Sequence, residues 1–85
     1  MAYTIQFTSS FEKDLKDLPK QVVQKIIPAV MALANNPRPS GCKKLKGSKY
    51  NYRIKIGDYR VIYEIEDAIL RVSVLAASHR KDVYE

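Results

Sequence analysis

Residues 50–63 read YNYRIKIGDYRVIY, and hydrophobicity in this stretch has a period of two. Apolar side chains at alternate positions up to Ile56 would share one face of a strand, with Arg53 and Lys55 on the other face. Gly57-Asp58 then predicts a two-residue hairpin turn, because glycine readily takes the positive φ that such a turn requires at its first central position. The sequence therefore predicts an antiparallel hairpin with a fixed register.

The register predicted by this turn puts two cations directly opposite each other. Ile56 should face Tyr59, and the next pair outward is Lys55 with Arg60. Like charges in such positions are destabilising unless an anion lies between them, or unless both side chains turn into water. We expect a phosphate, since arginine offers a planar fork of donors and lysine a mobile point charge. Arg53 would add a third contact on the same face.

The opposite face of the predicted hairpin is apolar and should pack on helices. The further pairs expected from the turn are Ile54–Val61, Arg53–Ile62 and Tyr52–Tyr63. The expected apolar face consists of Tyr50, Tyr52, Ile54, Val61, Tyr63 and Ile65.

Positive charge is concentrated in the middle of the chain. The 85 residues carry a formal net charge of +6, and residues 43–60 hold seven Lys or Arg against one acidic residue, Asp58. Such a patch raises the local potential and attracts a polyanion, whereas charge that serves solubility is spread around the surface. The segment from Lys43 to Arg60 is therefore interpreted as a cationic surface for nucleic-acid phosphates; the alternative is a solvated basic hairpin.

The N-terminal half predicts one strand and a helical hairpin. Residues 3–7 alternate apolar and polar positions, and Ser9 with Glu12 has the spacing of a capping box at a helix start. A first helix is expected over about residues 10–18, with its apolar stripe at Phe11, Leu15 and Leu18. A second is expected over about residues 19–35, with a kink or short interruption at Pro28.

The remaining segments complete an α+β plan for residues 1–85 as a single domain. Residues 35–41 form a loop on composition, to which no chemistry is assigned, and residues 69–77 predict a last, central strand with Val72, Val74 and Ala76 on one face. The expected order is an N-terminal strand, a two-helix hairpin and a three-stranded antiparallel meander, which together make a four-stranded sheet.

Several classes of function find no support in the sequence. Cys42 is the only cysteine, so no disulfide or cysteine-based metal cluster is expected, and we expect no metal site and no cofactor. Neither a signal peptide nor a membrane span is visible, which predicts a cytoplasmic protein without membrane contacts. Any chemistry must therefore come from the basic groups.

Four motifs resemble the RelE toxins of the RelE/ParE superfamily over nearly the whole chain. They are K-L-K-G at residues 44–47, Y-R-I-K-I at 52–56, G-D-Y-R-V-I-Y at 57–63 and H-R-K-D-V-Y at 79–84. The resemblance implies a type II toxin that cuts messenger RNA in the ribosomal A site without a metal ion. In this reaction the RNA 2′-hydroxyl attacks the adjacent phosphorus, expels the 5′-oxygen and leaves a 2′,3′-cyclic phosphate.

By the same resemblance, four residues are expected to be catalytic. Lys55 would be the general base and Arg60 would hold the phosphate. Arg80 would stabilise the transition state nearest the leaving group, for which His79 is an alternative acid, and Tyr84 would stack on or orient a base. Residues expected to contact RNA are Lys43, Lys44, Lys46, Lys49, Arg53, His79 and Lys81. Arg53 departs from the lysine of the best-known family type, so its role would be phosphate binding.

The resemblance also implies partners. A cognate antitoxin would neutralise the protein, the ribosome and messenger RNA would be its targets, and promoter DNA would be bound only by the toxin–antitoxin complex. Two other functions are compatible with the sequence: a ParE-like inhibitor of DNA gyrase, which shares the fold, and a non-catalytic RNA-binding module.

Overall fold

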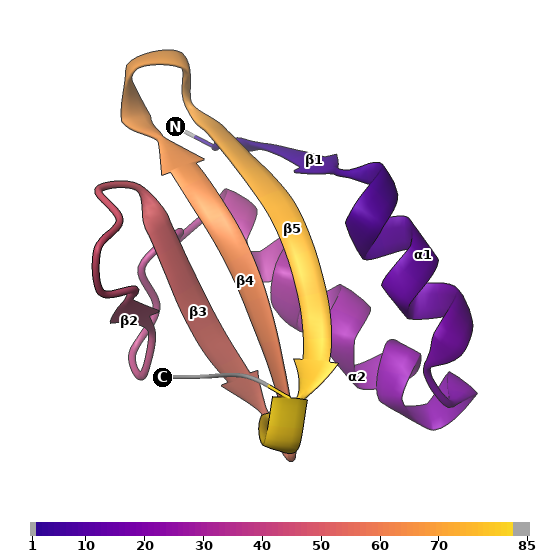
Figure 1. Ribbon diagram of the computed structural model, residues 1–85. Helices are drawn as coiled ribbons and strands as arrows, with labels where there is room; N and C mark the ends of the chain where they lie inside the picture. The colour runs from indigo at the N-terminus through magenta and orange to yellow at the C-terminus, as the bar shows by residue number, and fades with distance from the viewer. Residues whose placement is uncertain (1, 83–85) are drawn as a thin grey trace.

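The computed structural model describes residues 2–82 and contains two helices and a mixed sheet (Figure 1). The strands are β1 (Thr4–Phe7), β2 (Lys43–Lys44), β3 (Asn51–Ile56), β4 (Tyr59–Glu66) and β5 (Arg71–His79). The helices are α1 (Ser9–Asp17) and α2 (Lys20–Met31), and the 3₁₀ turns are η1 (Ala32–Ala34), η2 (Asp67–Ile69) and η3 (Arg80–Asp82). This arrangement confirms the α+β class.

The sheet has five strands in the order β1-β5-β4-β3-β2, so the expected count of four is too low. The additional strand is β2, whose two residues pair with Arg53 and Tyr52 of β3. A strand of two residues is too short to give a detectable period of two. β1 pairs in parallel with β5, which places β5 between β1 and β4 and confirms its expected central position.

The β3–β4 hairpin has the register that the turn predicts. Ile56 opposes Tyr59 and Lys55 opposes Arg60, and Gly57 has a φ of 59°. The helix-facing side of the hairpin is apolar as expected, except for Tyr50, which is 58% exposed. Tyr50 precedes β3, in the loop from β2, and the prediction that it packs in the core is wrong.

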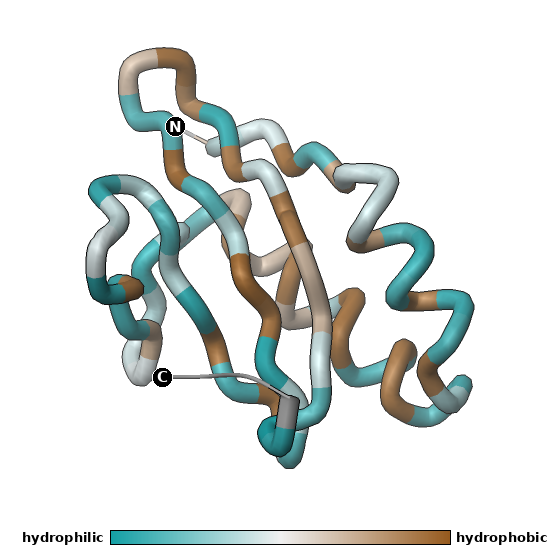
Figure 2. Tube along the Cα trace, viewed as in Figure 1, coloured by the Kyte–Doolittle hydropathy of each residue, from teal (hydrophilic) through white to brown (hydrophobic). Residues whose placement is uncertain are grey.

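One core lies between the sheet and the helices. Its fully or nearly buried members are Phe11, Ile26, Val30, Leu33, Ile54, Val61, Tyr63, Ile65, Val72, Val74 and Ala77. In Figure 2 the apolar residues follow the middle of β4, β5 and α2, whereas the end of the sheet near the β3–β4 turn is hydrophilic. The end of the sheet at the β3–β4 turn is therefore polar and lies outside the core.

A β-bulge in β5 changes which of its residues face the core. Ile62 opposes Ala76 but the next residue, Tyr63, opposes Val74, so Leu75 is an extra residue in β5. Before the bulge the buried core residues are at even positions, Val72 and Val74, and after it the buried residue is at an odd position, Ala77. The prediction that Ala76 shares their face is wrong, because a strict period of two does not continue through a bulge.

The start of α1 is capped by Thr8 and not by Ser9. The Thr8 hydroxyl accepts a hydrogen bond from the Phe11 N–H at 3.2 Å and donates to the Val74 carbonyl at 2.8 Å. The capping residue thus also joins the helix to β5, and the predicted pairing of Ser9 with Glu12 is replaced by this contact.

α2 continues through Pro28 without the expected interruption. Pro28 removes the hydrogen bond to the carbonyl of Gln24, but both residues are exposed, so water can satisfy that carbonyl. In the part of the chain that the structure describes, no helix combines the length and apolar character needed to cross a membrane.

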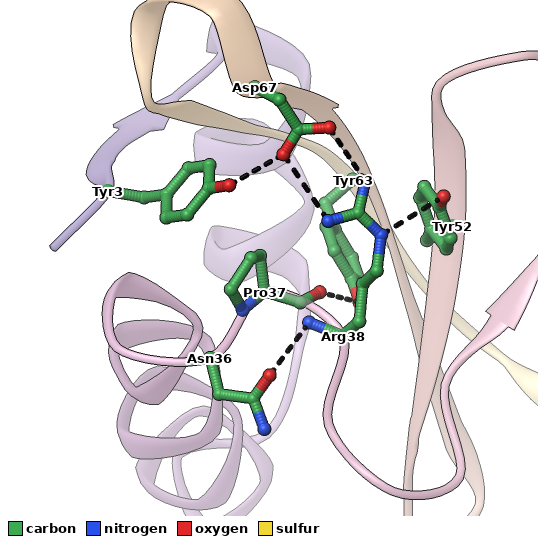
Figure 3. Close-up of polar contacts among 7 residues, drawn as sticks. All are labelled: Tyr3, Asn36, Pro37, Arg38, Tyr52, Tyr63 and Asp67. Atoms are coloured by element: carbon green, nitrogen blue, oxygen red, sulfur yellow. Dashed lines mark hydrogen bonds and ion pairs between the residues drawn. The ribbon is translucent and has the colours of Figure 1, made fainter. Parts of the chain in front are cut away.

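The loop after η1 is fixed to the sheet by Arg38 (Figure 3). Arg38 donates to both carboxylate oxygens of Asp67, at 3.3 and 2.8 Å, and the Tyr3 hydroxyl donates to the same group at 2.5 Å. The guanidinium also lies 5.2 Å from the centre of the Tyr52 ring. The buried Tyr63 hydroxyl donates to the Pro37 carbonyl at 2.8 Å. A loop without assigned chemistry thus joins β1, β3, β4 and η2.

This network predicts a pH-dependent stability that Asp67→Asn should remove. The hydrogen bond from Arg38, followed by that from Tyr3, lowers the pKa of Asp67. The stabilisation is therefore complete above the unfolded pKa of about 3.9 and is lost as pH falls through the lower folded value. Urea unfolding should show Asp67→Asn less stable than wild type at neutral pH, with the gap closing below about pH 4. Asp17→Asn is the control for the loss of a carboxylate. A stability difference between wild type and Asp67→Asn that does not change with pH would contradict the prediction.

Candidate nucleic-acid site at the β3–β4 hairpin

Lys55 and Arg60 form the first cross-strand pair beyond the residues that flank the turn. Hydrogen-bonded and non-hydrogen-bonded pairs alternate along an antiparallel ladder, so this pair is of the non-hydrogen-bonded kind, with Cα atoms only about 4.5 Å apart. Lys55 is exposed and Arg60 is half-buried. Two cations are therefore held close together at the polar end of the sheet.

The guanidinium of Arg60 folds back onto the turn. Its Nη1 donates to the carbonyl of Gly57 at 3.2 Å and to that of Tyr59 at 3.1 Å. One alternative from the sequence was that the side chains of Lys55 and Arg60 both turn into water. For Arg60 these two hydrogen bonds contradict it. The turn therefore fixes the position of the guanidinium beside Lys55.

η3 follows β5 at the end of the sheet where β3 and β4 turn (Figure 1), and Arg80 is its first residue. Its backbone N–H donates to the Asp58 carbonyl at 2.7 Å, and its Nη1 lies 3.7 Å from Asp58 Oδ1. Both side chains are more than half exposed, so this ion pair contributes no more than about 1 kcal/mol to stability. The structure thus brings together three cations from β3, β4 and η3.

Arg53 is on the same face but not on its surface. It is only 4% exposed, whereas the sequence led us to expect an accessible phosphate contact. Lys43 of β2 opposes Arg53 and is exposed, so it continues the cationic face towards the edge of the sheet.

His79 lies away from the Lys55–Arg60 pair. It opposes Tyr59, whose ring centre is 5.2 Å from that of the imidazole, and Ser78 is the residue opposite Arg60. His79 Nδ1 accepts a hydrogen bond from the Lys81 N–H at 3.2 Å. Residues Tyr59 and His79 share the helix-facing side, because the bulge at Leu75 shifted the alternation of β5. Sequence reasoning therefore missed Ser78 and gave Asp58 no role.

The other candidate residues are spread around this end and the adjoining loop. Lys44 pairs with Tyr52, and Lys46 and Lys49 are exposed in the loop between β2 and β3. Lys81 is exposed in η3. Tyr84 lies outside the described residues.

A groove of about 470 Å³ runs beside Lys55 on the helical side of the sheet edge. It is lined mainly by apolar groups, including Ala29, Leu33 and Ile56, and by the loop residues Pro39 and Gly41. The groove is distinct from the cationic face, because its other lining residues are mainly apolar. Lys55 borders both the groove and the cationic face.

Comparison with known proteins identifies the family of the chain. The family model described as "ParE toxin of type II toxin-antitoxin system, parDE" matches residues 5–84. The chain is 33% identical to a putative toxin RelE1 of Methanocaldococcus jannaschii, over 100% of this chain and 98% of the relative. It is 28% identical to toxin RelG of Mycobacterium tuberculosis, over 99% and 98% of the two chains.

Solved structures give the same result. The toxin in an archaeal RelE–RelB complex from Pyrococcus horikoshii superposes with a TM-score of 0.83 at 27% identity, covering 98% of this chain and 100% of that one. The match to the family model, the similar toxins and the shared fold show that the chain is a RelE-type toxin that belongs to the RelE/ParE superfamily of type II toxin–antitoxin systems.

Proposed function

We propose that this toxin is an endoribonuclease that cuts messenger RNA in the ribosomal A site and so stops translation. The observation that carries the proposal is the convergence of Lys55, Arg60 and Arg80 at the exposed polar end of the sheet. A gyrase inhibitor needs a binding surface only, whereas cleavage needs groups that move a proton and stabilise charge at one phosphate.

The proposed reaction uses the RNA itself as nucleophile. The 2′-hydroxyl oxygen forms a bond to the adjacent phosphorus while the bond to the 5′-oxygen breaks, which gives a 2′,3′-cyclic phosphate and a 5′-hydroxyl. Lys55, in its neutral form, would accept the 2′-hydroxyl proton. Arg60 would hold the non-bridging oxygens, and Arg80 would neutralise charge developing towards the leaving group.

The proton for the leaving oxygen is more readily supplied from the side of Arg80 than by His79. His79 opposes Tyr59 on the helix-facing side, whereas Lys55 and Arg60 share the other face of the hairpin. Arg80 is held by Asp58 at the turn that joins the strands of Lys55 and Arg60. Because a guanidinium is a poor acid, we assign Arg80 charge stabilisation, with the proton arriving through water bound at the same site.

The exposed lysines would hold the RNA backbone, and Lys43 offers a direct test. Each lysine that neutralises a phosphate releases counterions, so Lys43→Ala should weaken RNA binding modestly and reduce the salt slope by about one unit. Fluorescence anisotropy with a short single-stranded RNA at several salt concentrations measures both. Lys20→Ala, at the start of α2, is the charge-matched control, and an unchanged slope for Lys43→Ala would remove Lys43 from the interface.

We further propose that a cognate antitoxin neutralises the protein. The toxin of the P. horikoshii structure is in complex with RelB, and the superposition covers 98% of the present chain. An antitoxin segment with an apolar face would fit the groove beside Lys55 and cover that residue at the same time. Promoter DNA would be bound by the complex, and the free toxin would not need to bind it.

The test is to incubate the purified protein with programmed ribosomes and to map the ends of the messenger RNA. We expect cuts in the A-site codon, with a 2′,3′-cyclic phosphate on the upstream product. A supercoiling assay with purified DNA gyrase tests the ParE-like alternative. This assay is needed because the matching family is described as ParE toxins. Intact RNA together with inhibited gyrase would overturn the proposal.

A further inference from the structure

The β3–β4 turn contacts both arginines of the candidate site through consecutive carbonyl groups. Gly57 and Tyr59 accept hydrogen bonds from the Arg60 guanidinium, and Asp58 between them accepts one from the Arg80 N–H. Asp58 is also the single acidic residue between Lys43 and Arg60 in the sequence. Its carboxylate lies beside the Arg80 guanidinium, on the turn that joins the strands of Lys55 and Arg60.

Asp58 binds Arg80 in two ways that differ in strength. The backbone hydrogen bond of 2.7 Å fixes the first residue of η3 to the turn, and it does not depend on the Asp58 side chain. The carboxylate is 3.7 Å from Arg80 Nη1, and the two side chains are 64% and 59% exposed. At that separation and exposure the pair is weak and salt-sensitive, so an RNA phosphate can replace the carboxylate at little cost.

We propose that Asp58 is a positioning residue: its carboxylate holds the Arg80 guanidinium at the phosphate site in the free protein and yields its place to an RNA phosphate when substrate binds. The replacement of the carboxylate by an RNA phosphate rests on the proposed function, whereas the contact with Arg80 in the free protein does not. The carboxylate is a stand-in for the phosphate, and it sets the direction of Arg80 before RNA arrives.

Asp58→Asn separates this role from a role in forming the turn. Asparagine is well suited to turns and keeps both the size and the backbone carbonyl, so the hairpin should be unaffected. Removing the carboxylate should raise KM about threefold, because the variant must order the Arg80 side chain when RNA binds. The kcat at saturating RNA should stay close to the wild-type value, because the bound phosphate then aligns Arg80. Asp58→Glu should reverse part of the rise in KM, and Glu12→Gln on α1 controls for the change in net charge.

A second measurement does not depend on cleavage. NMR relaxation of the Arg80 Nε–H group should show an ordered guanidinium in the wild type and a mobile one in Asp58→Asn. Saturation with a short single-stranded RNA should restore order in the variant.

The outcomes distinguish the two proposals. Equal order of Arg80 in wild type and Asp58→Asn overturns the positioning role, as does a variant with the wild-type kcat and KM. If the wild type cuts no messenger RNA, the proposed nuclease function fails, and the relaxation data still decide whether Asp58 holds Arg80.

Discussion

Lys55→Ala is expected to slow messenger RNA cleavage on the ribosome by about 10²-fold or more. Lys55 is the exposed member of the cross-strand pair with Arg60, and it is the proposed acceptor of the 2′-hydroxyl proton. Alanine removes that acceptor while the strand and its register stay in place, because the Lys55 side chain is not part of the core. Single-turnover cleavage at saturating toxin measures the loss directly.

Two variants make the result specific. Lys55→Arg keeps the positive charge but provides no group that can accept the proton, so binding should persist while the cleavage rate remains low. Lys49→Ala removes a lysine from the exposed β2–β3 loop and should leave the single-turnover rate within a factor of about three. A rate for Lys55→Ala within that same range would remove Lys55 from the catalytic group.

Phe11→Ala should be the most destabilising single substitution among those considered, at about 3–5 kcal/mol. The ring is fully buried, lies 5.1 Å from that of Phe7 in an edge-to-face arrangement, and joins α1 to the core. A domain of this size has only about 5–15 kcal/mol of stability, so a large part of it would be lost. We expect a fall in the melting temperature on the order of 20 °C, measured by circular dichroism.

An exposed position two residues further along α1 gives the control for Phe11. Lys13 is exposed on the same helix, and Lys13→Ala should change the free energy of unfolding by less than about 0.5 kcal/mol. Phe11→Leu should lie between the two. A loss below about 1 kcal/mol for Phe11→Ala would mean that α1 is not an integral part of the core.

The hairpin was predictable because its determinants are local. Gly57-Asp58 set the turn, the turn set the register, and the register placed Lys55 opposite Arg60. The same logic failed in β5, where the bulge at Leu75 depends on pairing with Ile62 and Tyr63 of another strand. One indication of the irregularity in β5 was visible in the sequence. Odd-numbered and even-numbered positions of residues 69–77 are both largely apolar, as expected for a central strand with a bulge.

The less predictable parts of the site depend on contacts between distant segments. The spacing of Arg53 predicts that it lies in a strand. It does not predict that the side chain is only 4% exposed, because burial depends on packing against other parts of the chain. The contact between Arg80 and Asp58 joins residues from separate elements, and so does that between Arg38 and Asp67. Neither has a spacing that a single sequence reveals. The position of His79 could not be predicted without the bulge.

The parallel pairing of β1 with β5 has a consequence for synthesis of the protein. β1 lies at one edge of the sheet, and its partners Arg71 to Val74 follow it by 67 residues in the chain, since Thr4 pairs with Arg71. Such distant pairings form late, since a long loop must close before they add stability. Arg80 follows β5 directly, so the sheet and the cationic site are completed together. A nascent chain that does not yet include β5 and η3 has neither the complete sheet nor the complete site, so the proposed nuclease activity should be absent until both have been made.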